Sequence, residues 1–362
     1  MNAKVYVGMS GGVDSSLTAA LLQREGYDVT GVYMKNWTQD LPGMKCLWAD
    51  DLADAKRVAV QLDVPFKVFD FQKEYKQKVV DYMIGEYKAG RTPNPDIMCN
   101  QEVKFKLFLD AALADGADMI ATGHYAVVKN GELHKASDEA KDQTYFLYRV
   151  DQSALQKTLM PLGTMTKSEV RQKAAKLGLA TASKKDSQGI CFVGKVGIKD
   201  FLLQYIEPKS GDVIDKKTSK KIGEHDGAIF YTFGQRHGLG VGGGLPYYVV
   251  GKDMAKNIVY VTTDLNDDSL WRNRFRLAQL HWINGVPDPH KTYQVRTRYR
   301  APLITCKISD MTDNELTLEL ANAERAITPG QSAVLYDGDR VVGGGVVAET
   351  LALRDLSATL PI

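Results

Sequence analysis

A loop rich in glycine and serine near the start of the chain has the composition of a phosphate-binding loop. Residues 10–16 read Ser-Gly-Gly-Val-Asp-Ser-Ser and lie between an apolar, β-prone stretch at residues 4–9 and a helical pattern that stops at Gly26. A strand that turns through glycines into a helix directs backbone N–H groups and the positive end of the helix dipole at one spot, which favours phosphate. No Gly-Lys-Ser/Thr follows at the spacing of a Walker A loop, so a nucleotide loop of another class is predicted.

The order of residues 10–16 resembles the pyrophosphate loop (PP-loop) of the ATP pyrophosphatases, which cut ATP between the α and β phosphates and adenylate a substrate. A plain glycine turn is the alternative for a lone Gly-Gly pair, but seven matching positions in a strand–loop–helix context favour the nucleotide loop. A second glycine motif, G-x-G-x-x-G at residues 238–243, is followed by Gly244-Leu245-Pro246 instead of a helix. We therefore expect a loop without a cofactor there.

Two cysteines lie in loops that could support thiol chemistry. Cys99 follows a segment with two prolines and precedes Asn100, a residue suited to cap a following helix. A thiol just before a helix N-terminus is expected to have a lowered pKa, because the dipole favours the thiolate. Asp96 is a candidate acid or base, or a turn cap, and Cys191 lies in a polar, glycine-containing segment at residues 186–192.

Cysteine usage also indicates the compartment. The four cysteines stand far apart, at positions 46, 99, 191 and 306, without any Cys-x-x-Cys. This spacing argues against a structural zinc site and favours a reducing compartment, so we expect a cytoplasmic protein. Cys306, in a strand-like context, and Cys46 are expected to be small buried hydrophobic residues.

Composition and charge set the broad class of protein. The chain has 362 residues, of which 44% are hydrophobic, and this predicts two or three domains with full cores. Charges at Lys4, Asp14 and Arg24 interrupt any secretory signal, and no apolar run is long enough to cross a membrane. The formal net charge is only +2, so no global field favours nucleic acid.

Local basic clusters in the second half nevertheless predict a polyanionic partner. Arg296, Arg298 and Arg300 alternate along an expected strand, so they would emerge on one face. Further clusters are the arginines at 272, 274 and 276 and the lysines at 216, 217, 220 and 221. A solvated strand face explains any single cluster, but three together favour a polyanion.

The first 200 residues alternate strands and helices. Strands are expected at residues 4–9, 28–34, 66–69 and 119–122, and helices at 13–25, 52–62, 72–89 and 102–114. Repeated βα units predict a parallel sheet with helices on both faces and ligands beyond the carboxyl ends of its strands. Later residues read as strands and turns, with alternating leucines at 316, 318 and 320 and a hairpin at Asp337-Gly338.

These patterns predict an α/β protein of three parts. A nucleotide-binding domain with a parallel sheet is expected over residues 1–202, and the resemblance of its loop to the PP-loop implies the adenine nucleotide α-hydrolase type. A small β-rich central domain is expected over 203–272, and a C-terminal β-barrel over 273–362.

Six motifs together resemble the bacterial tRNA-specific 2-thiouridylase family. They occur in family order across essentially the whole chain, at residues 8–16, 92–100, 121–125, 141–147, 186–192 and 298–300. The PP-loop alone would indicate an adenylating enzyme, whereas the paired cysteine motifs make the resemblance specific. It implies an ATP-dependent sulfurtransferase that adenylates C2 of the wobble uridine of tRNA and replaces its oxygen with sulfur, giving 2-thiouridine, AMP and pyrophosphate.

The resemblance also implies roles for the catalytic and nucleotide-binding residues. Cys99 would be the nucleophile and Cys191 the persulfide carrier, and Cys99 would either free sulfide or resolve the persulfide as a Cys99–Cys191 disulfide. Asp96 would be an acid or base, and Asp14 would organise Mg²⁺. The expected ATP-binding residues are Gly8, Met9, Ser10, Gly11, Gly12, Val13, Asp14 and Ser15, with Met34 and Gly123 bordering the adenine and ribose.

RNA-binding roles follow from the same resemblance. A base in an RNA loop is read by being splayed out of the stack, and Asn94, Pro95 and Asp96 would contact it. Further expected tRNA contacts are His124, Lys141, Asp142, Gln143, Arg298, Tyr299 and Gln331. His124 has an equal alternative as a residue closing a strand.

Partners and competing functions complete the prediction. The expected partners are tRNA and a persulfide donor, such as a cysteine desulfurase or a sulfur-relay protein. No association with a membrane is expected. An iron–sulfur cluster is the less favoured alternative to persulfide chemistry. Such a cluster is usually held by several cysteines, whereas Cys99, Cys191 and Asp96 could supply only three ligands. A synthetase that activates a small carbonyl for an amine would need neither cysteine, and a non-catalytic nucleotide-binding regulator would never split ATP.

Overall fold

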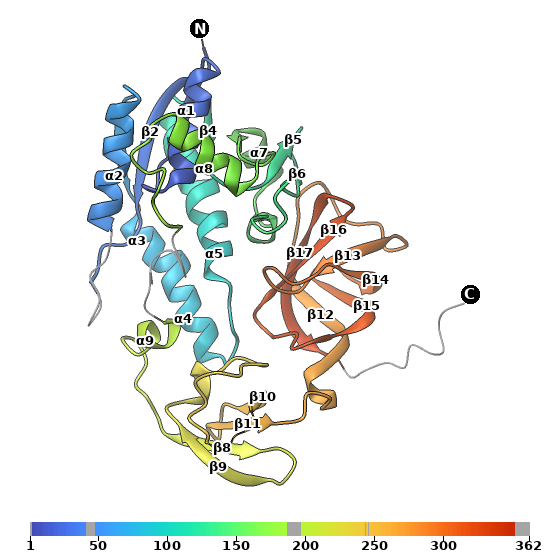
Figure 1. Ribbon diagram of the computed structural model, residues 1–362. Coiled ribbons are helices and arrows are strands. Elements are labelled where there is room, and N and C mark those ends of the chain that lie inside the picture. The colour runs from blue at the N-terminus through green and yellow to red at the C-terminus, as the bar shows by residue number, and fades with distance from the viewer. Residues whose placement is uncertain (1, 41–47, 187–196, 243, 245, 352–362) are drawn as a thin grey trace.

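The computed structural model describes residues 2–40, 48–186, 197–242, 244 and 246–351. Within these residues it contains a five-stranded, a four-stranded and an eight-stranded sheet. Figure 1 shows the first at the upper left, the second at the bottom and the third, a barrel, at the right. No helix in the described part of the chain has the length and apolar character needed to span a membrane.

The N-terminal sheet is parallel throughout and has the order β3-β2-β1-β4-β7. Its strands are β1 (Lys4–Gly8), β2 (Asp28–Lys35), β3 (Phe66–Asp70), β4 (Met119–Ala121) and β7 (Thr158–Leu159). Side chains alternate along β1, so Val5 and Val7 join one core while Tyr6 joins the core on the opposite face. A sheet covered on both faces explains why the middle of β1 and most of β2 are apolar and buried.

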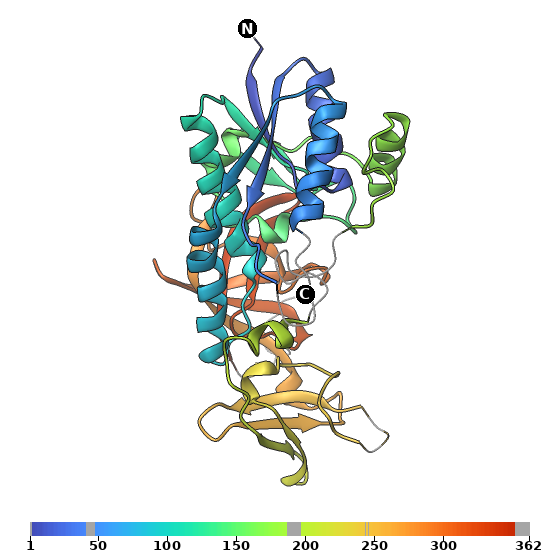
Figure 2. The same ribbon diagram turned by 90° about the vertical axis from the view of Figure 1, so that its left-hand side faces the viewer.

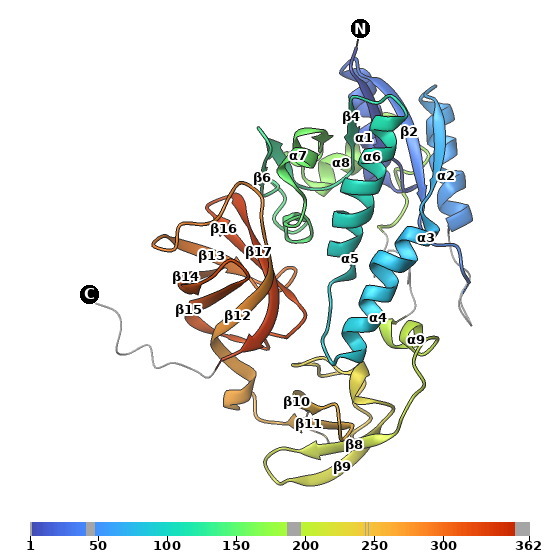
Figure 3. The same ribbon diagram turned by 180° about the vertical axis from the view of Figure 1, so that it is seen from behind.

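Helices cover both faces of this sheet, as predicted. One side carries α1 (Val13–Arg24), α2 (Trp48–Gln61) and α8 (Lys167–Lys176), and Figure 2 shows them apart from the helices of the other side. That other side carries α3 (Gln72–Tyr75), the π-helical segment Lys76–Val80 and α4 (Asp81–Lys88), which run on as one helix. Beside it lie α5 (Pro95–Met98), a second π-helical segment (Cys99–Leu107) and α6 (Phe108–Ala114), also continuous (Figure 3).

The start of this last helix differs from the prediction. It begins at Pro95, with Asn94 as the N-cap residue, and not near Glu102. Proline is suited to the first helical position because its φ is already helical and its missing N–H has no partner to lose there. Asn100 therefore caps nothing, and its amide donates a 3.0 Å hydrogen bond to the Phe146 carbonyl instead.

The central sheet is small and has the order β10-β11-β8-β9. It consists of β8 (Gly211–Asp215), β9 (Lys220–His225), β10 (Tyr248–Asp253) and β11 (Ile258–Thr262) and follows α9 (Ile198–Leu202). Val213, Val249 and Val259 are fully buried and form its core.

Six antiparallel strands close into a C-terminal barrel, because β12 pairs with both β15 and β17. The strands are β12 (Trp271–Trp282), β13 (Thr292–Arg296), β14 (Ile304–Met311), β15 (Glu315–Arg325), β16 (Ser332–Asp337) and β17 (Arg340–Thr350). The alternating leucines at 316, 318 and 320 are buried inside it, as is Cys306, whose thiol pKa burial raises to about 12. The predicted fold class is confirmed.

Two features of the barrel were not predicted. A hairpin from the N-terminal half, β5 (Val127–Lys129) and β6 (Glu132–His134), joins the barrel sheet beside β17. The expected strand through Arg300 was wrong: β13 ends at Arg296, and Ala301 N–H bonds back to the Arg298 carbonyl in a turn. Arg296, Arg298 and Arg300 therefore do not share a strand face.

Short helices complete the described structure. These are α7 (Gln152–Gln156) and the 3₁₀ turns Thr144–Phe146, Ala228–Phe230 and Asp268–Leu270.

Candidate functional site

The loop between β1 and α1 has the geometry of an anion site. Gly11 has φ +74°, and a Cβ added there would overlap the Asp51 carbonyl oxygen, so both the conformation and the close approach require glycine. The Ser15 hydroxyl accepts a 3.1 Å hydrogen bond from Ser10 N–H and fixes the turn. The N-cap residue of α1, Gly12, supplies no side-chain cap. The start of α1 therefore presents N–H groups to a ligand, as phosphate binding requires.

Residues expected to bind ATP converge on this loop. Gly123 follows the end of β4, and an added Cβ would lie 2.8 Å from Ser15 N and 2.9 Å from Asp14 C. Met34, near the end of β2, packs against Gly8, where an added Cβ would lie 3.0 Å from the Met34 methyl group. The structure thus gathers the loop, Met34 and Gly123 at the carboxyl ends of β1, β2 and β4, where parallel sheets bind ligands.

Asp14 is held by two residues that the sequence analysis did not select. The Lys167 ammonium lies 2.7 Å and 2.8 Å from the two carboxylate oxygens of Asp14, and the Tyr125 hydroxyl donates a 2.9 Å hydrogen bond to Asp14 Oδ1. Thr166 and Glu169 form a capping box that begins α8, so the motif Thr-x-x-Glu could have located that helix start. The contact with Asp14, 153 residues away, carries no local signal.

Asp186 joins the same cluster of charges. Its carboxylate pairs with Lys141 at 2.7 Å, Lys167 at 2.9 Å and Arg171 at 2.7 Å. Burial alone would raise the pKa of Asp186, but the hydrogen bonds from Lys141 and Lys167 outweigh it and lower the pKa to about 2. This carboxylate is therefore ionised at neutral pH.

Asp14 also fits the expected role toward Mg²⁺. The described residues contain no group of three or more His, Cys, Asp or Glu side chains able to hold a metal ion. Mg²⁺ at nucleotide sites is commonly held by one or two carboxylates together with substrate phosphates. A single carboxylate beside the PP-loop satisfies that chemistry.

The two cysteines expected to carry the sulfur chemistry are described unequally. Cys99 is 2% exposed and lies in the second turn of the helix that begins at Pro95, so its predicted place just before a helix N-terminus was wrong. Asp96 lies in the first turn of that helix and is half-buried. Cys191 and Cys46 lie outside the described residues.

The segment expected to contact the target base is fastened to the barrel. Asn94 Nδ2 donates a 3.0 Å hydrogen bond to Gln331 Oε1, and Ser332 N–H donates a 2.8 Å bond to Asn94 Oδ1. Gln331 Nε2 in turn donates a 2.8 Å bond to the Thr92 carbonyl. Asn94 and Gln331, which are both expected to contact RNA, are thus hydrogen-bonded to each other.

Most other expected RNA contacts also have protein partners. Asp142 is 2% exposed and pairs with Arg296 at 2.9 Å, and Gln143 Oε1 accepts a 2.9 Å bond from Tyr125 N–H. His124 is buried beside Thr122, and desolvation, helped by the Lys104 charge, lowers its pKa well below 6.5. This burial supports the alternative in which His124 closes the end of a strand.

Arg298 and Tyr299 are more accessible. The Arg298 side chain is about half exposed, at 47%, and its guanidinium lies 3.5 Å from Glu324. The Tyr299 ring packs 4.4 Å from the Phe146 ring. This turn is thus an aromatic and basic patch beside the junction of barrel and N-terminal domain.

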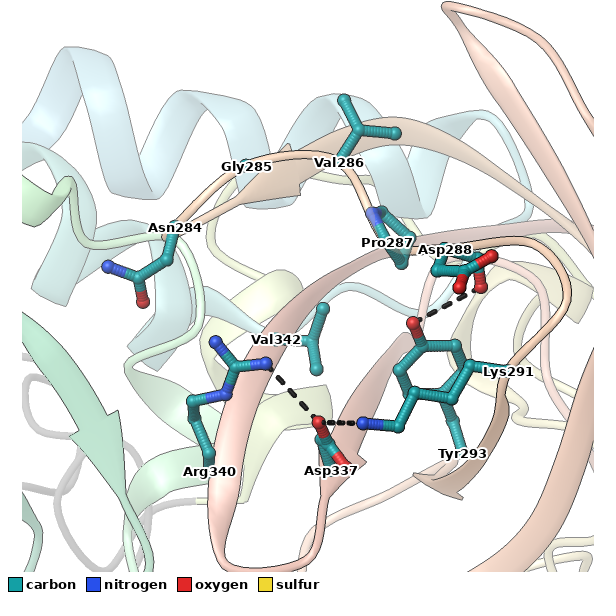
Figure 4. Close-up of a pocket in the computed structure, with 10 residues that line it drawn as sticks. All are labelled: Asn284, Gly285, Val286, Pro287, Asp288, Lys291, Tyr293, Asp337, Arg340 and Val342. Carbon is teal, nitrogen blue, oxygen red and sulfur yellow. Dashed lines mark hydrogen bonds and ion pairs between the residues drawn. The ribbon is translucent and has the colours of Figure 1, made fainter.

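A cavity of about 300 Å³ lies on the barrel and contains none of the expected site residues. Figure 4 shows Asp337 between Lys291, at 2.5 Å, and Arg340, at 3.2 Å. Elsewhere in the lining of the cavity, the Tyr293 hydroxyl donates a hydrogen bond to the Asp288 carbonyl. Three of the charged residues that line the cavity, Lys291, Asp337 and Arg340, are thus paired with one another.

The fold and the loop define a nucleotide-binding α/β protein with two appended β-modules, and comparison with known proteins gives the family. Family models described as tRNA methyl transferase HUP domain, tRNA methyl transferase PRC-barrel domain and aminomethyltransferase beta-barrel domain match residues 3–195, 199–263 and 272–347. A tRNA-specific 2-thiouridylase MnmA of Methylobacillus flagellatus is 46% identical over 97% of this chain and 100% of its own length. One from Ralstonia nicotianae is 48% identical over 96% and 97%.

The chain therefore belongs to the tRNA-specific 2-thiouridylase family, which confirms the resemblance and the enzyme class predicted from the motifs. Among solved structures, a 4-thiouridine synthetase in an RNA complex with bound ATP is 19% identical. It covers 56% of this chain and 50% of its own, with a TM-score of 0.38, which is too low to support an inference.

Proposed function

We propose that this enzyme is an ATP-dependent sulfurtransferase that converts the wobble uridine of tRNA to 2-thiouridine. The observation that carries the proposal is the PP-loop, with its glycine-dependent turn and its helix start without a side-chain cap, in a chain whose relatives are named tRNA-specific 2-thiouridylase. ATP binds at Gly8–Ser15, with Met34 and Gly123 beside the adenine and ribose. Asp14 would hold Mg²⁺, which neutralises phosphate charge when bound.

The first chemical step activates the base. The C2 oxygen of uridine attacks the α phosphorus of ATP, the bond to the β phosphate breaks, and pyrophosphate leaves. The oxygen, a poor leaving group as a carbonyl, then departs as part of AMP. The loop N–H groups and the positive end of α1 stabilise the charge on the departing phosphates.

The second step delivers sulfur. A persulfide on Cys191 supplies the sulfur atom that replaces the oxygen at C2, and AMP leaves. Cys99 is the second thiol, and its attack on Sγ of Cys191 forms a Cys99–Cys191 disulfide and releases the outer sulfur. That sulfur leaves either as free sulfide, which then attacks C2, or already bonded to C2, and an external thiol reduces the disulfide afterwards. Asp96, three residues before Cys99 on the same helix, is the proposed acid or base.

RNA recognition is proposed along the junction of the domains. Asn94, Pro95 and Asp96 contact the target base, while other tRNA contacts come from Lys141, Gln143, Arg298, Tyr299 and Gln331. His124 and Asp142, which the resemblance also gives to tRNA, are buried and would act by positioning their neighbours. The exposed Arg298 and the ring of Tyr299 support this role most directly. A cysteine desulfurase or sulfur-relay protein supplies the persulfide in the cytoplasm. We retain residues 1–202, 203–272 and 273–362 as the three domains.

The decisive experiment is thiolation in vitro. Protein, ATP, Mg²⁺ and unmodified tRNA are incubated with a persulfide-loading donor or, in parallel, with sulfide, and the digested nucleosides are analysed by mass spectrometry. Cys306→Ser, at a buried cysteine of the barrel, is the matched control for Cys99→Ser and Cys191→Ser.

We expect ATP-dependent thiouridine with the wild type and the control, and none with the donor when Cys99 or Cys191 is replaced. ATP cleavage without thiouridine would instead favour another adenylating enzyme. No cleavage at all would favour a nucleotide-binding regulator.

A further inference from the structure

We propose that Lys167 is a phosphate-binding residue for ATP, and that it exchanges the Asp14 carboxylate for a phosphate group while Asp186 keeps its ammonium in place. This inference rests on the proposed function, because it assigns a new residue to the same nucleotide site. It concerns a charge 153 residues from the loop in sequence and in direct contact with it in the fold.

The position of Lys167 is fixed by α8. It is the first residue of that helix, directly after the Thr166 N-cap, and its backbone N–H donates a 2.9 Å bond to Asp138. Its ammonium touches both oxygens of Asp14 and lies 2.9 Å from Asp186 and 5.7 Å from the centre of the Tyr125 ring. The side chain is 13% exposed, so the charge is largely shielded from bulk water.

The partner of Lys167 lies where the phosphates are expected. Asp14 is the second residue of α1, in the turn whose N–H groups have no side-chain cap, and its main chain lies against Gly123. Its carboxylate is 31% exposed. An anion bound at the start of α1 therefore meets the ammonium of Lys167 as the nearest side-chain cation that the structure describes beside Asp14.

The ammonium of Lys167 lies between two carboxylates, so it can exchange one and keep the other. It contacts Asp14 at 2.7 Å and Asp186 at 2.9 Å, while Lys141 and Arg171 also pair with Asp186. In the structure, the Asp14 carboxylate is bonded to the ammonium. When the phosphates arrive, Lys167 bonds to them, and Asp186 continues to orient it from the other side.

This exchange has a chemical consequence. Breaking the bond between the α and β phosphates of ATP places additional negative charge on the departing pyrophosphate. A shielded ammonium held by Asp186 stabilises that charge without first having to be oriented. Asp14, once released by Lys167, is available to a bound cation.

The test is the equilibrium affinity for the non-cleavable analogue α,β-methylene-ATP, measured by calorimetry in EDTA so that no metal is present. Lys167→Ala should weaken binding by about 10- to 100-fold, the range of one charged hydrogen bond. Lys167→Arg should keep most of the affinity. Lys176→Ala, at an exposed lysine of the same helix, is the matched control and should match the wild type.

The sign of a second variant separates exchange from a simple structural ion pair. Under exchange, Asp14→Asn frees the ammonium from its competitor, so the metal-free analogue should bind several-fold more tightly than to the wild type. The double variant Asp14→Asn, Lys167→Ala should resemble Lys167→Ala. If the Asp14–Lys167 pair only stabilised the fold, Asp14→Asn and Lys167→Ala would weaken binding of the analogue to a similar extent. That result would overturn the proposal.

Failure of the inference and failure of the proposed function give different results. If the wild type binds the analogue and Lys167→Ala binds it equally well, the role of Lys167 is refuted and the nucleotide site stands. If the wild type does not bind the analogue even with Mg²⁺ restored, the proposed function falls as well.

Discussion

Two ion pairs in this enzyme are similar in chemistry and differ in the burial of the carboxylate. Asp142 and Arg296 are 2% and 12% exposed and join the N-terminal domain to the barrel, whereas Asp14 and Lys167, at 31% and 13%, lie beside the PP-loop. A buried pair cannot lose one partner without leaving a charge stranded in a poor solvent for ions. A pair at a ligand site can exchange its partner for an anion. We therefore expect the Asp142–Arg296 pair to stay intact and the Asp14–Lys167 pair to separate when an anion binds.

The neighbours of each pair support this distinction. Around Asp142, the Thr144 hydroxyl bonds to the carboxylate and to the Tyr336 hydroxyl, while Tyr145 donates a 2.8 Å bond to the Ser332 carbonyl. The bonds to Tyr336 and to Ser332 join residues 192 and 187 positions apart, and both are buried. The barrel is thus bonded to the N-terminal domain by buried groups, close to where it contacts the segment 92–94 that leads to Cys99.

The largest expected effect comes from breaking the buried pair. Asp142→Ala leaves the Arg296 guanidinium buried without its carboxylate and should lower the free energy of unfolding by about 3–5 kcal/mol. Asp81→Ala, which removes an exposed pair with Lys76, should cost less than about 1 kcal/mol. Urea unfolding of both variants measures the difference. Equal costs would mean that burial does not distinguish the two pairs.

The turn at Gly330 provides the next largest effect. Gly330 has φ +93°, and an added Cβ would lie 2.7 Å from Thr92 N and 2.8 Å from Arg91 Cβ. Gly330→Ala should therefore destabilise the protein by about 1–3 kcal/mol, through backbone strain and overpacking together. Gly338→Ala isolates the strain, because Gly338 has φ +67° and open space around it.

Chemical denaturation of the two glycine variants separates these contributions. A larger loss for Gly330→Ala would confirm that the barrel turn is pressed against the segment leading to Cys99. A loss no larger than that of Gly338→Ala would show that the turn can withdraw from Thr92.

The contrast between the two pairs also explains what the sequence could predict. Local patterns predicted four of the five strands of the parallel sheet and most of its helices, because period-2 and period-3.6 apolar spacing is carried by neighbouring residues. The short strand β7 and the helix α8 were not predicted. The helix start at Pro95 was missed although proline at the first helical position is a local signal. The partners of Asp14 and Asp142, and the hairpin β5–β6 beside the barrel, depend on contacts between distant segments.

A smaller effect is expected from pH. Burial keeps the His124 pKa well below 6.5 in the folded state, so below pH 6.5 the unfolded chain binds a proton that the folded chain does not. Stability contributed by neutral His124 is thus complete above pH 6.5 and declines as pH falls, with a slope of at most about 1.4 kcal/mol per pH unit. His124→Gln should remove this part of the slope between pH 6.5 and 5. Parallel curves for the two proteins would contradict the buried, neutral imidazole.

The smallest effect concerns two arginines that stand two residues apart. Arg296 pairs with Asp142 at 2.9 Å and is mostly buried. Arg298 is about half exposed and comes no closer to Glu324 than 3.5 Å, a long contact, so its guanidinium remains available to a phosphate. Arg298→Ala should weaken tRNA binding several-fold and reduce the slope of log affinity against log salt by about 0.7–0.9, the share of one phosphate contact. Filter binding across a salt series measures both, with Arg24→Ala, an exposed arginine at the far end of α1 from the loop, as control. An unchanged slope would mean that Arg298 serves its contact with Glu324 and not a phosphate, so the turn would then have a structural role, as the Asp142–Arg296 pair does.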